Sequence, residues 1–252
     1  MCPWMTDDTT LDVFLDGRLR IRQPRTGYRA ATDPILLAAA VHARPGERVL
    51  ELGCGVGVAL LALGRRVGGL GMVGVERQEA YATLARVNAR DNGIDAVIET
   101  ADLMALPPAL RVGFDHVLTN PPFYRPDAPG ARDLGRDAAL REDTPLADWL
   151  GQGVKRVRSG GYLTLIHLAE RLPEILTALH GPMGAIAVRP LTARTGRAAG
   201  RVLVQARKGA KGPFRLLAPL VLHSGDRHLA DGDDFSPTAQ ALLRDAQALD
   251  WD

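Results

Sequence analysis

The apolar and polar positions divide the chain into short strand-like runs that alternate with helical stretches. Five runs of β-branched or apolar residues are bounded by Gly, Asp or Pro and predict strands: 48–53, 71–76, 96–102, 114–120 and 161–168. Between and after them lie helical patterns at 57–66, 78–91, about 137–158 and 170–180. Strands that alternate with helices predict parallel βαβ units in a doubly wound α/β sheet, where ligands bind at the carboxyl ends of the strands.

The N-terminal part of the chain has a different pattern. Residues 13–21 alternate around Asp16-Gly17, which predicts a β-hairpin with a two-residue turn. An apolar stretch then predicts a helix over about 34–43, with Pro34 at the first helical position and Asp33 in the capping place.

The C-terminal part carries two strand-like runs, 184–191 and 200–208, with no helix between them. This spacing predicts an antiparallel ending of the sheet. No repeat, linker or low-complexity segment divides the chain. We therefore expect an N-terminal hairpin extension over 1–30 and a single domain over 31–252.

The composition is that of a soluble globular protein. The 252 residues are 46% hydrophobic, which suffices for a sizeable core, yet no run of 18 apolar residues occurs. The first residues lack the order of a signal peptide, so we expect a cytoplasmic protein without membrane contact. Cys2 and Cys54 form no C-x-x-C pair and are expected to be reduced. Of the six histidines, only His223 and His228 approach a metal-ligand spacing, and they have no acidic or Cys partner in step, so we predict no metal.

Charge is unevenly distributed although the net charge is only +2. Eight cations and no acid lie within 189–215, and a second basic run spans 18–29. The segment from Asp226 onward holds seven Asp. The basic runs could bind a polyanion or could be ordinary solvated faces, and the sequence leaves both interpretations open.

A glycine-rich loop follows the first strand of the predicted sheet. The stretch LELGCGVG (50–57) places Gly53, Gly55 and Gly57 between that strand and a helix, where the backbone must turn tightly and can approach a ligand. A nucleotide-like ligand is indicated, with a ligand-free turn as the alternative. Val58 occupies the place of the third glycine of the dinucleotide pattern, which disfavours NAD.

Acidic residues end the next two predicted strands. Glu76 lies 19 residues beyond Gly57, where a carboxylate can accept both hydroxyls of a ribose. Asp102 could accept from the amino group of an adenine, although Asp is also common as a cap or turn residue.

These features in this order, with Glu51 opening the glycine loop, resemble the class I S-adenosylmethionine (SAM) methyltransferases between about residues 48 and 167. The resemblance implies a Rossmann-like, seven-stranded sheet with an antiparallel last strand and SAM as cofactor. It implies a small loop residue rather than a nucleophile at Cys54. It also implies which residues contact the cofactor. Glu76 would bind the ribose of SAM, and Asp102 with the Leu103 backbone would bind its adenine. The loop from Gly53 to Gly57, which follows Glu51, would bind its methionine end.

The motif NPPF (120–123) at the end of the fourth strand of that sheet resembles methyltransferases that modify planar amino nitrogens. The lone pair of such an amine is delocalised into its ring, which makes the nitrogen a poor nucleophile. The Asn120 side-chain carbonyl and the Pro121 backbone carbonyl can each accept one N–H, which favours a pyramidal nitrogen. Pro121 and Pro122 stiffen the chain and keep the acceptors aimed.

The aromatic residues that follow the prolines suit a base. Phe123 would stack on the target base, a contact worth about 1–3 kcal/mol in nucleic-acid complexes, and Tyr124 could extend the wall. No strong general base is expected, because the proton leaves after the nitrogen has gained its methyl group.

Residues 27–41, NPPFY and residues 189–209 together resemble the bacterial tRNA1(Val) adenine-N6 methyltransferases. This resemblance implies that Thr32 and Asp33 border the SAM pocket and that Arg194, Arg197 and Arg201 contact RNA phosphates, with a helix cap and a solvated loop as the respective alternatives. It implies a tRNA partner and transfer to the N6 amine of an adenine.

Three other functions stay open at this stage. The same motif serves guanine-N2 methylation of ribosomal RNA and glutamine-N5 methylation of a protein. A module that binds SAM and RNA but has lost its chemistry is the non-enzymatic alternative, which the intact motif disfavours.

Overall fold

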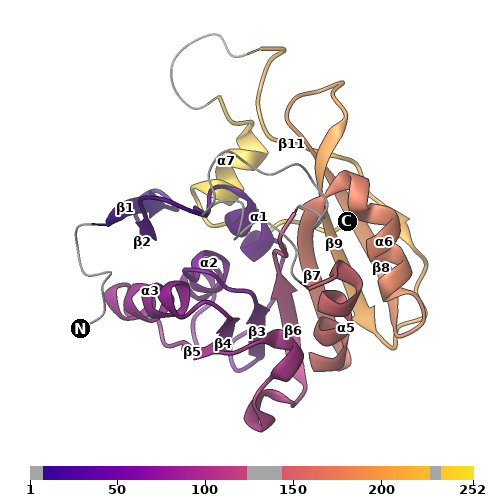
Figure 1. Cartoon of the computed structure of the whole chain (residues 1–252). Helices are drawn as coiled ribbons and strands as arrows, with labels where there is room; N and C mark the ends of the chain where they lie inside the picture. The colour runs from indigo at the N-terminus through magenta and orange to yellow at the C-terminus, as the bar shows by residue number, and fades with distance from the viewer. Residues whose placement is uncertain (1–7, 124–143, 228–233) are drawn as a thin grey trace.

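A twisted, mostly parallel β-sheet with helices on both faces forms the core of the protein (Figure 1). The computed structural model describes residues 8–123, 144–227 and 234–252. Seven strands form the body of the sheet in the order β5-β4-β3-β6-β7-β9-β8. Their bounds are β3 Arg48–Leu52, β4 Gly71–Glu76, β5 Val97–Thr100, β6 Phe114–Thr119, β7 Val157–Leu168, β8 Met183–Thr192 and β9 Ala199–Lys208.

The topology of the sheet confirms the predicted fold class. β9 runs antiparallel to its neighbours β7 and β8, whereas the pairs among β3 to β7 are parallel. Two short strands, β10 (Arg215–Leu216) and β11 (Leu220–Val221), pair with β8 and bring the described sheet to nine strands. β3 lies between β4 and β6, so the chain order reverses there and a ligand crevice forms at their carboxyl ends.

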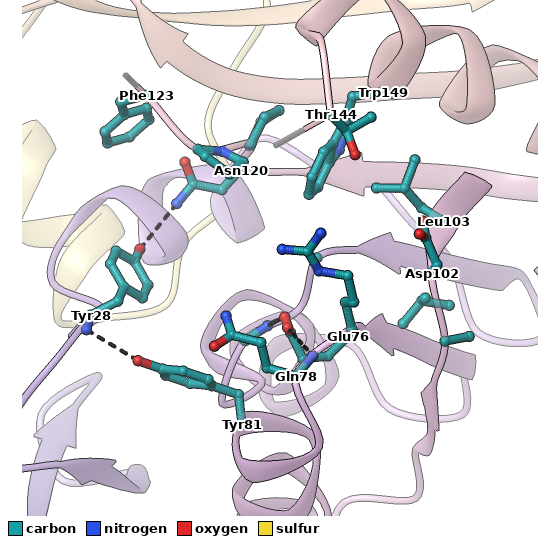
Figure 2. A pocket seen from close by; sticks show the side chains of 17 residues that line it. Tyr28, Glu76, Gln78, Tyr81, Asp102, Leu103, Asn120, Phe123, Thr144 and Trp149 are labelled. Atoms are coloured by element: carbon teal, nitrogen blue, oxygen red, sulfur yellow. Dashed lines mark hydrogen bonds between the residues drawn. The ribbon is translucent and has the colours of Figure 1, made fainter. Parts of the chain in front are cut away.

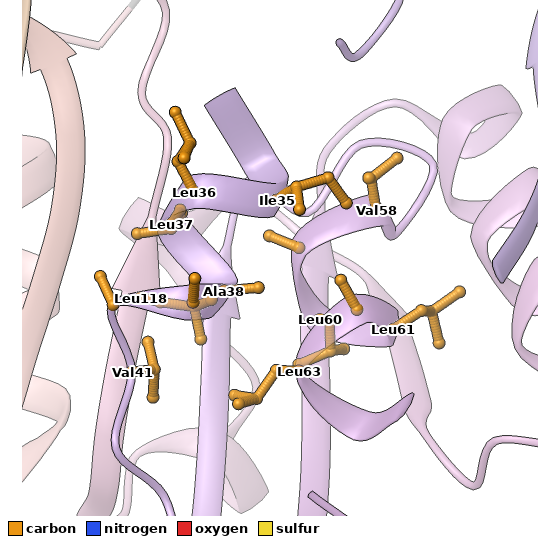
Figure 3. Close-up of a cluster of buried hydrophobic side chains, with 14 of the residues drawn as sticks. Ile35, Leu36, Leu37, Ala38, Val41, Val58, Leu60, Leu61, Leu63 and Leu118 are labelled. Carbon is orange, nitrogen blue, oxygen red and sulfur yellow. The ribbon is translucent and has the colours of Figure 1, made fainter. Parts of the chain in front are cut away.

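Helices cover the two faces because side chains on successive strand residues point to opposite sides. One buried cluster joins Val49 of β3 to α1 and α2, and the other joins Leu50 of β3 to α5 and α6. Figure 3 shows the packing of α1 on α2, in which Leu36 and Leu60 are fully buried. The helices are α1 Asp33–Ala39, α2 Val58–Arg66, α3 Glu79–Asp91, α5 Leu146–Arg156, α6 Leu172–Leu179 and α7 Pro237–Leu243, with short 3-10 turns η1 Leu103–Ala105, η2 Pro108–Leu110 and η3 Ala169–Arg171.

The N-terminal hairpin consists of β1 (Thr9–Phe14) and β2 (Leu19–Pro24) and packs against α2 and α3. Its loop is longer than the expected two residues, because Phe14 pairs with Leu19 and residues 15–18 form the turn. Gly17 and the two residues before it all have positive φ, which lets the longer turn close. Leu19 and Ile21 are fully buried, so the hairpin shares the core of the helices beneath it.

Several predicted boundaries shift by a few residues. The first helix ends at Ala39 rather than 43, and its N-cap is Thr32, so the capping place given to Asp33 was wrong. Asp33 is instead the first helical residue, where its carboxylate faces the positive end of the helix dipole. The helix expected from 137 begins, as far as the chain is described, at Leu146, and residues 137–143 and Tyr124 lie outside the described residues.

Two kinds of feature are absent from the described residues. No helix there has the length and apolar composition that crossing a bilayer requires. No group of three or more His, Cys, Asp or Glu side chains in those ranges is arranged to hold a metal ion.

Candidate active site

The loop after β3 turns sharply into α2 at the crevice. Gly53, Gly55 and Gly57 all have positive φ, which non-glycine residues rarely adopt. The backbone N–H groups of Gly53 and Cys54 both donate to the Val75 carbonyl, which ties the loop to β4. A Cβ on Gly53 would lie 2.6 Å from Cζ2 of Trp149, so the indole ring packs directly on the loop backbone.

Glu51 lies beneath this loop with only 3% of its surface exposed. Its Oε2 accepts the backbone N–H of Leu60 at 2.9 Å. Burial, reinforced by the nearby charge of Glu76, raises the pKa of the Glu51 carboxyl well above its usual range. Glu51 also lines a small hollow beside the main cleft, where a bound ammonium group would restore the charged form.

Glu76 ends β4 and faces the main cleft with both carboxylate oxygens engaged by backbone (Figure 2). Oε2 accepts from the N–H of Gly55 at 2.9 Å, and Oε1 accepts from the N–H of Gln78 at 2.9 Å. Burial raises the pKa of this carboxyl, while those two hydrogen bonds oppose the rise. A carboxylate has more acceptor positions than these bonds use, so a ligand hydroxyl can still bind there.

Asp102 and Leu103 border the same cleft at the carboxyl end of β5. The Asp102 side chain caps the 3-10 turn η1 by accepting the N–H of Met104 at 2.8 Å. Asp102 is therefore a cap, which was the alternative considered for it. Because Asp102 also lines the cleft, its second carboxylate oxygen is available to a ligand.

Asn120 follows β6 and lies at the junction of the main cleft and the small hollow. Its Nδ2 donates to the Tyr28 hydroxyl at 3.5 Å (Figure 2). Its Oδ1 is buried and has no hydrogen-bond partner within the described part of the chain. A buried carbonyl oxygen without a donor is costly unless a ligand supplies one, so this atom fits an incoming N–H.

A histidine of β7 holds the rest of the NPPF motif in place. Pro121, Pro122 and Phe123 line the main cleft with Asn120. Nε2 of His167 donates to the Pro122 carbonyl at 3.2 Å, and the same ring meets Phe123 edge-on at 5.4 Å between centroids. Burial, aided by the nearby charge of Arg171, lowers the pKa of His167 to about 4, so its ring is neutral near pH 7.

Trp149 closes the opposite side of the cleft. Its Nε1 donates to Thr119 Oγ1 at 2.7 Å, and that hydroxyl donates to the Leu52 carbonyl at 2.8 Å. The indole is therefore held to the ends of both β6 and β3, the two strands that flank the crevice.

The main cleft has about 880 Å³ of empty space, a figure that includes open solvent. Of the expected cofactor residues, the wall includes Gly53, Gly55, Glu76, Asp102, Leu103 and Asn120, and the adjoining hollow adds Glu51. Gly57 lies one turn further on, as the N-cap of α2. Thr32 and Asp33 line neither space, and their neighbours Ala30 and Pro34 border the small hollow instead.

The arginines expected to contact phosphates have different surroundings. Arg194 is 14% exposed in its side chain and pairs with Asp234, and it also donates to the carbonyl of Ser224. Arg201 pairs with Asp33. Arg197 is exposed in the turn between β8 and β9 and forms no ion pair with any described residue. Of the three, Arg197 alone keeps the solvated guanidinium that the prediction requires.

Several residues of the cleft were not predicted as site residues, among them Tyr28, Gln78, Tyr81 and Trp149. Tyr28 and Tyr81 are linked, because the backbone N–H of Tyr28 donates to the Tyr81 hydroxyl at 3.1 Å. Burial raises the pKa of the Tyr28 hydroxyl, and the charges of Asp33 and Glu51 raise it further. The hydroxyl therefore stays protonated. The aromatic residues carried no motif, and only their placement in space reveals them.

Comparison with known proteins agrees with this geometry. Residues 31–133 match the family model of the methyltransferase small domain. A tRNA1(Val) (adenine(37)-N6)-methyltransferase of Dickeya chrysanthemi is 27% identical over 242 residues, 89% of this chain and 90% of that protein. A shorter match, 45% identical over 98 residues, is to the 23S rRNA (uracil(1939)-C(5))-methyltransferase RlmD of Alkalilimnicola ehrlichii, covering 37% of this chain and 21% of that protein.

A solved structure shares the fold over most of its length. The crystal structure of a predicted O-methyltransferase, protein Atu636 from Agrobacterium tumefaciens, is 26% identical, with a TM-score of 0.69 over 86% of this chain and 97% of that one. Family, relatives and fold together confirm the resemblance to the class I methyltransferases, whose cofactor is SAM.

Proposed function

We propose that this chain, a SAM-dependent methyltransferase of the class I fold, transfers a methyl group to the N6 amine of an adenine in RNA, and that the RNA is a tRNA. One observation carries the proposal: the Oδ1 of Asn120 is buried without a described donor, and Asn120 lines both the main cleft and the small hollow together with Gly53. The name of the Dickeya relative supports the choice of adenine and of tRNA.

We assign the cofactor contacts residue by residue. Glu76 would accept the ribose hydroxyls, and Asp102 with the Leu103 backbone would border the adenine of SAM. The loop Gly53 to Gly57 would hold the methionine end, with its ammonium group toward the buried Glu51 carboxyl. Bound SAM supplies a methyl group on a positively charged sulfur.

The residues of the NPPF motif prepare the acceptor nitrogen. Asn120 Oδ1 would accept one N–H of the adenine amine and the Pro121 carbonyl the other, so the lone pair turns toward the methyl group. The nitrogen–carbon bond forms as the carbon–sulfur bond breaks, and the amine then loses a proton to water. Phe123 would stack on the flipped base and offset part of the free energy spent on extruding it.

The acceptor pair favours an amine over a hydroxyl. A hydroxyl carries one hydrogen and keeps its lone pairs available, so two fixed hydrogen-bond acceptors would bring it little. The likeness to a predicted O-methyltransferase is therefore one of fold, and we assign N-methylation to this site.

Replacing Asn120 tests the proposal directly. Asn120→Ala removes the acceptor oxygen, so we expect the rate of methyl transfer to fall by at least about 100-fold, while SAM affinity measured by calorimetry changes little. Asn120→Asp keeps an oxygen in place and should retain more activity than the alanine variant. Unchanged turnover in Asn120→Ala would reject the assigned role.

The substrate is identified by following the label. The protein is incubated with methyl-labelled SAM and separately with total tRNA, total rRNA and total protein, and the products are digested for mass analysis. N6-methyladenosine from the tRNA fraction is the expected product. N2-methylguanosine, 5-methyluridine or N5-methylglutamine would each assign the site to a different acceptor, and no product despite SAM binding would make the chain a binding module.

A further inference from the structure

The aromatic ring of the NPPF motif is held from two sides before any substrate binds. The guanidinium carbon of Arg201 lies 4.5 Å from the centroid of the Phe123 ring, over its face. His167 meets the same ring edge-on, with an interplanar angle of 83°. A side chain contacted on one face and one edge has lost most of its rotational freedom, and because Phe123 also lines the main cleft, part of its ring remains accessible to a ligand.

Arg201 is itself fixed by a residue from a distant part of the sequence. Its Nε lies 3.2 Å from Oδ2 of Asp33, and the two side chains are 34% and 25% exposed. Asp33 is the first residue of α1, whereas Arg201 lies near the start of β9. The pair therefore connects the helix beside the small hollow to the aromatic ring of the motif.

The geometry of this pair differs from that of a phosphate contact. A guanidinium that binds a carboxylate through Nε and lies over a ring has directed part of its surface inward. Phosphate binding needs positive charge that solvent and RNA can reach, a requirement that Arg197 in the neighbouring turn meets.

We propose that Arg201, oriented by Asp33, is a positioning residue that fixes the Phe123 ring so that its free face receives the target base, and that it is not a phosphate contact. This proposal rests on the proposed function for the identity of the base. The contact between Arg201 and Phe123 rests on the geometry alone.

Lysine in place of Arg201 separates the two roles. Lysine keeps the charge and can still bind a phosphate, but it lacks the planar group that stacks on a ring. We therefore expect Arg201→Lys to lower kcat by about 10- to 100-fold, because the acceptor base is misplaced. The dependence of RNA affinity on salt concentration should stay as in the wild type, and so should SAM affinity.

Asp33→Asn gives a second test in which the two roles predict different outcomes. Removing an acidic neighbour would strengthen a phosphate contact and tighten RNA binding. Under the proposal the variant releases Arg201 and lowers kcat. Arg90→Lys is the matched control, because Arg90 lies on α3 with 76% of its side chain exposed, and it should change neither quantity.

A spectroscopic measurement keeps this proposal separable from the proposed function. The five phenylalanines are replaced by 4-fluorophenylalanine, and the Phe123 signal is assigned with Phe123→Leu. Arg201→Lys and Asp33→Asn should both shift this fluorine resonance, and Arg90→Lys should not. If the wild type methylates no RNA while the resonance shifts, the function fails and the contact stands.

The proposal is overturned by any of three results. These are an unshifted resonance in Arg201→Lys, wild-type kcat in that variant, or tighter RNA binding with wild-type kcat in Asp33→Asn. Thermal unfolding of each variant shows whether a loss of kcat comes from unfolding. A fall in kcat that follows the unfolded fraction would also count against the proposal.

Discussion

His167 is a neutral histidine in the interior of the site, and its role is to hold backbone. It is fully buried on β7, and it donates to the carbonyl of Pro122, which has no N–H of its own to anchor the loop. Because Pro122 precedes Phe123, this hydrogen bond fixes the chain at the point where the aromatic ring begins.

The lowered pKa of His167 predicts how stability depends on pH. The folded pKa is about 4 and the reference value is 6.5. Between these values the unfolded chain binds more protons than the folded one, so stability rises with pH across this window and falls on acidification. The loss attributable to His167 is about 3 kcal/mol between pH 7 and pH 4.

Urea unfolding of His167→Gln tests this expectation. Glutamine can still donate to the Pro122 carbonyl but does not titrate, so the variant should lose less stability than the wild type as the pH falls from 6.5 to 4. His180→Gln, at an exposed histidine, is the matched control for the substitution. Parallel pH dependences of wild type and His167→Gln would show that the ring is not held neutral.

Among the elements, the loop between β3 and α2 depends most on its neighbours. Gly53 has φ +71°, and the ring of Trp149 from α5 occupies the space that a Cβ would need. The glycine is therefore required for two reasons: its backbone conformation and the close approach of a helix from the other face of the sheet.

Substitution at Gly53 separates these two reasons. Gly46 has φ +88°, and no atom lies within 4 Å of the position that a Cβ would take there, so Gly46→Ala measures backbone strain alone. We expect Gly53→Ala to destabilise the protein by about 1–3 kcal/mol more, because the methyl group overpacks against the indole. In a Trp149→Ala background this excess should disappear. Equal unfolding free energies of the two single variants would exclude the overpacking.

At the scale of the molecule, the described arginines of the two basic runs have different positions and partners. On β9, Arg201 is the strand neighbour of Leu168 at the carboxyl end of β7, near the cleft, whereas Arg207 is the neighbour of Tyr162, in the middle of β7. In the N-terminal run, Arg29 pairs with Asp12 at 2.6 Å and Arg22 with Asp91 at 3.2 Å. Much of the positive charge therefore serves the fold.

The C-terminal segment accepts hydrogen bonds from a further basic side chain and also packs against α1. Arg189 donates to the carbonyls of Asp250 and Asp252. Trp251 is 5% exposed, and its Nε1 donates to the Ala40 carbonyl at 2.9 Å, just past the end of α1. The acidic residues of this segment thus lie beside basic ones, and its indole packs into the core.

Salt dependence tests which cations meet RNA. Each phosphate contact should contribute about 0.7–0.9 to the slope of logarithmic affinity against logarithmic salt concentration. We expect Arg197→Gln to reduce the slope by about this amount and to raise KM. Arg207→Gln at the far end of β9 should leave the slope as it is. Equal slopes for wild type and Arg197→Gln would remove Arg197 from the interface.

Short-range patterns in the sequence determined the class of fold and the centre of the site. Strand and helix periodicity, the glycines of 53–57 and the NPPF motif each depend on residues within one element or one turn, where backbone sterics act locally. The alternation of strands and helices then allowed few topologies, because crossovers between parallel strands are right-handed and short.

Tertiary structure alone decided the partners of individual side chains. Trp149 joins the cleft from α5, Arg194 pairs with Asp234, and Arg201 reaches Asp33 across 168 positions of the sequence. The energy of a charge or a ring depends on which atoms surround it, and burial and distance arise only when the sheet brings remote segments together. The sequence therefore located the chemistry, and the packed structure determined which residues hold it in place.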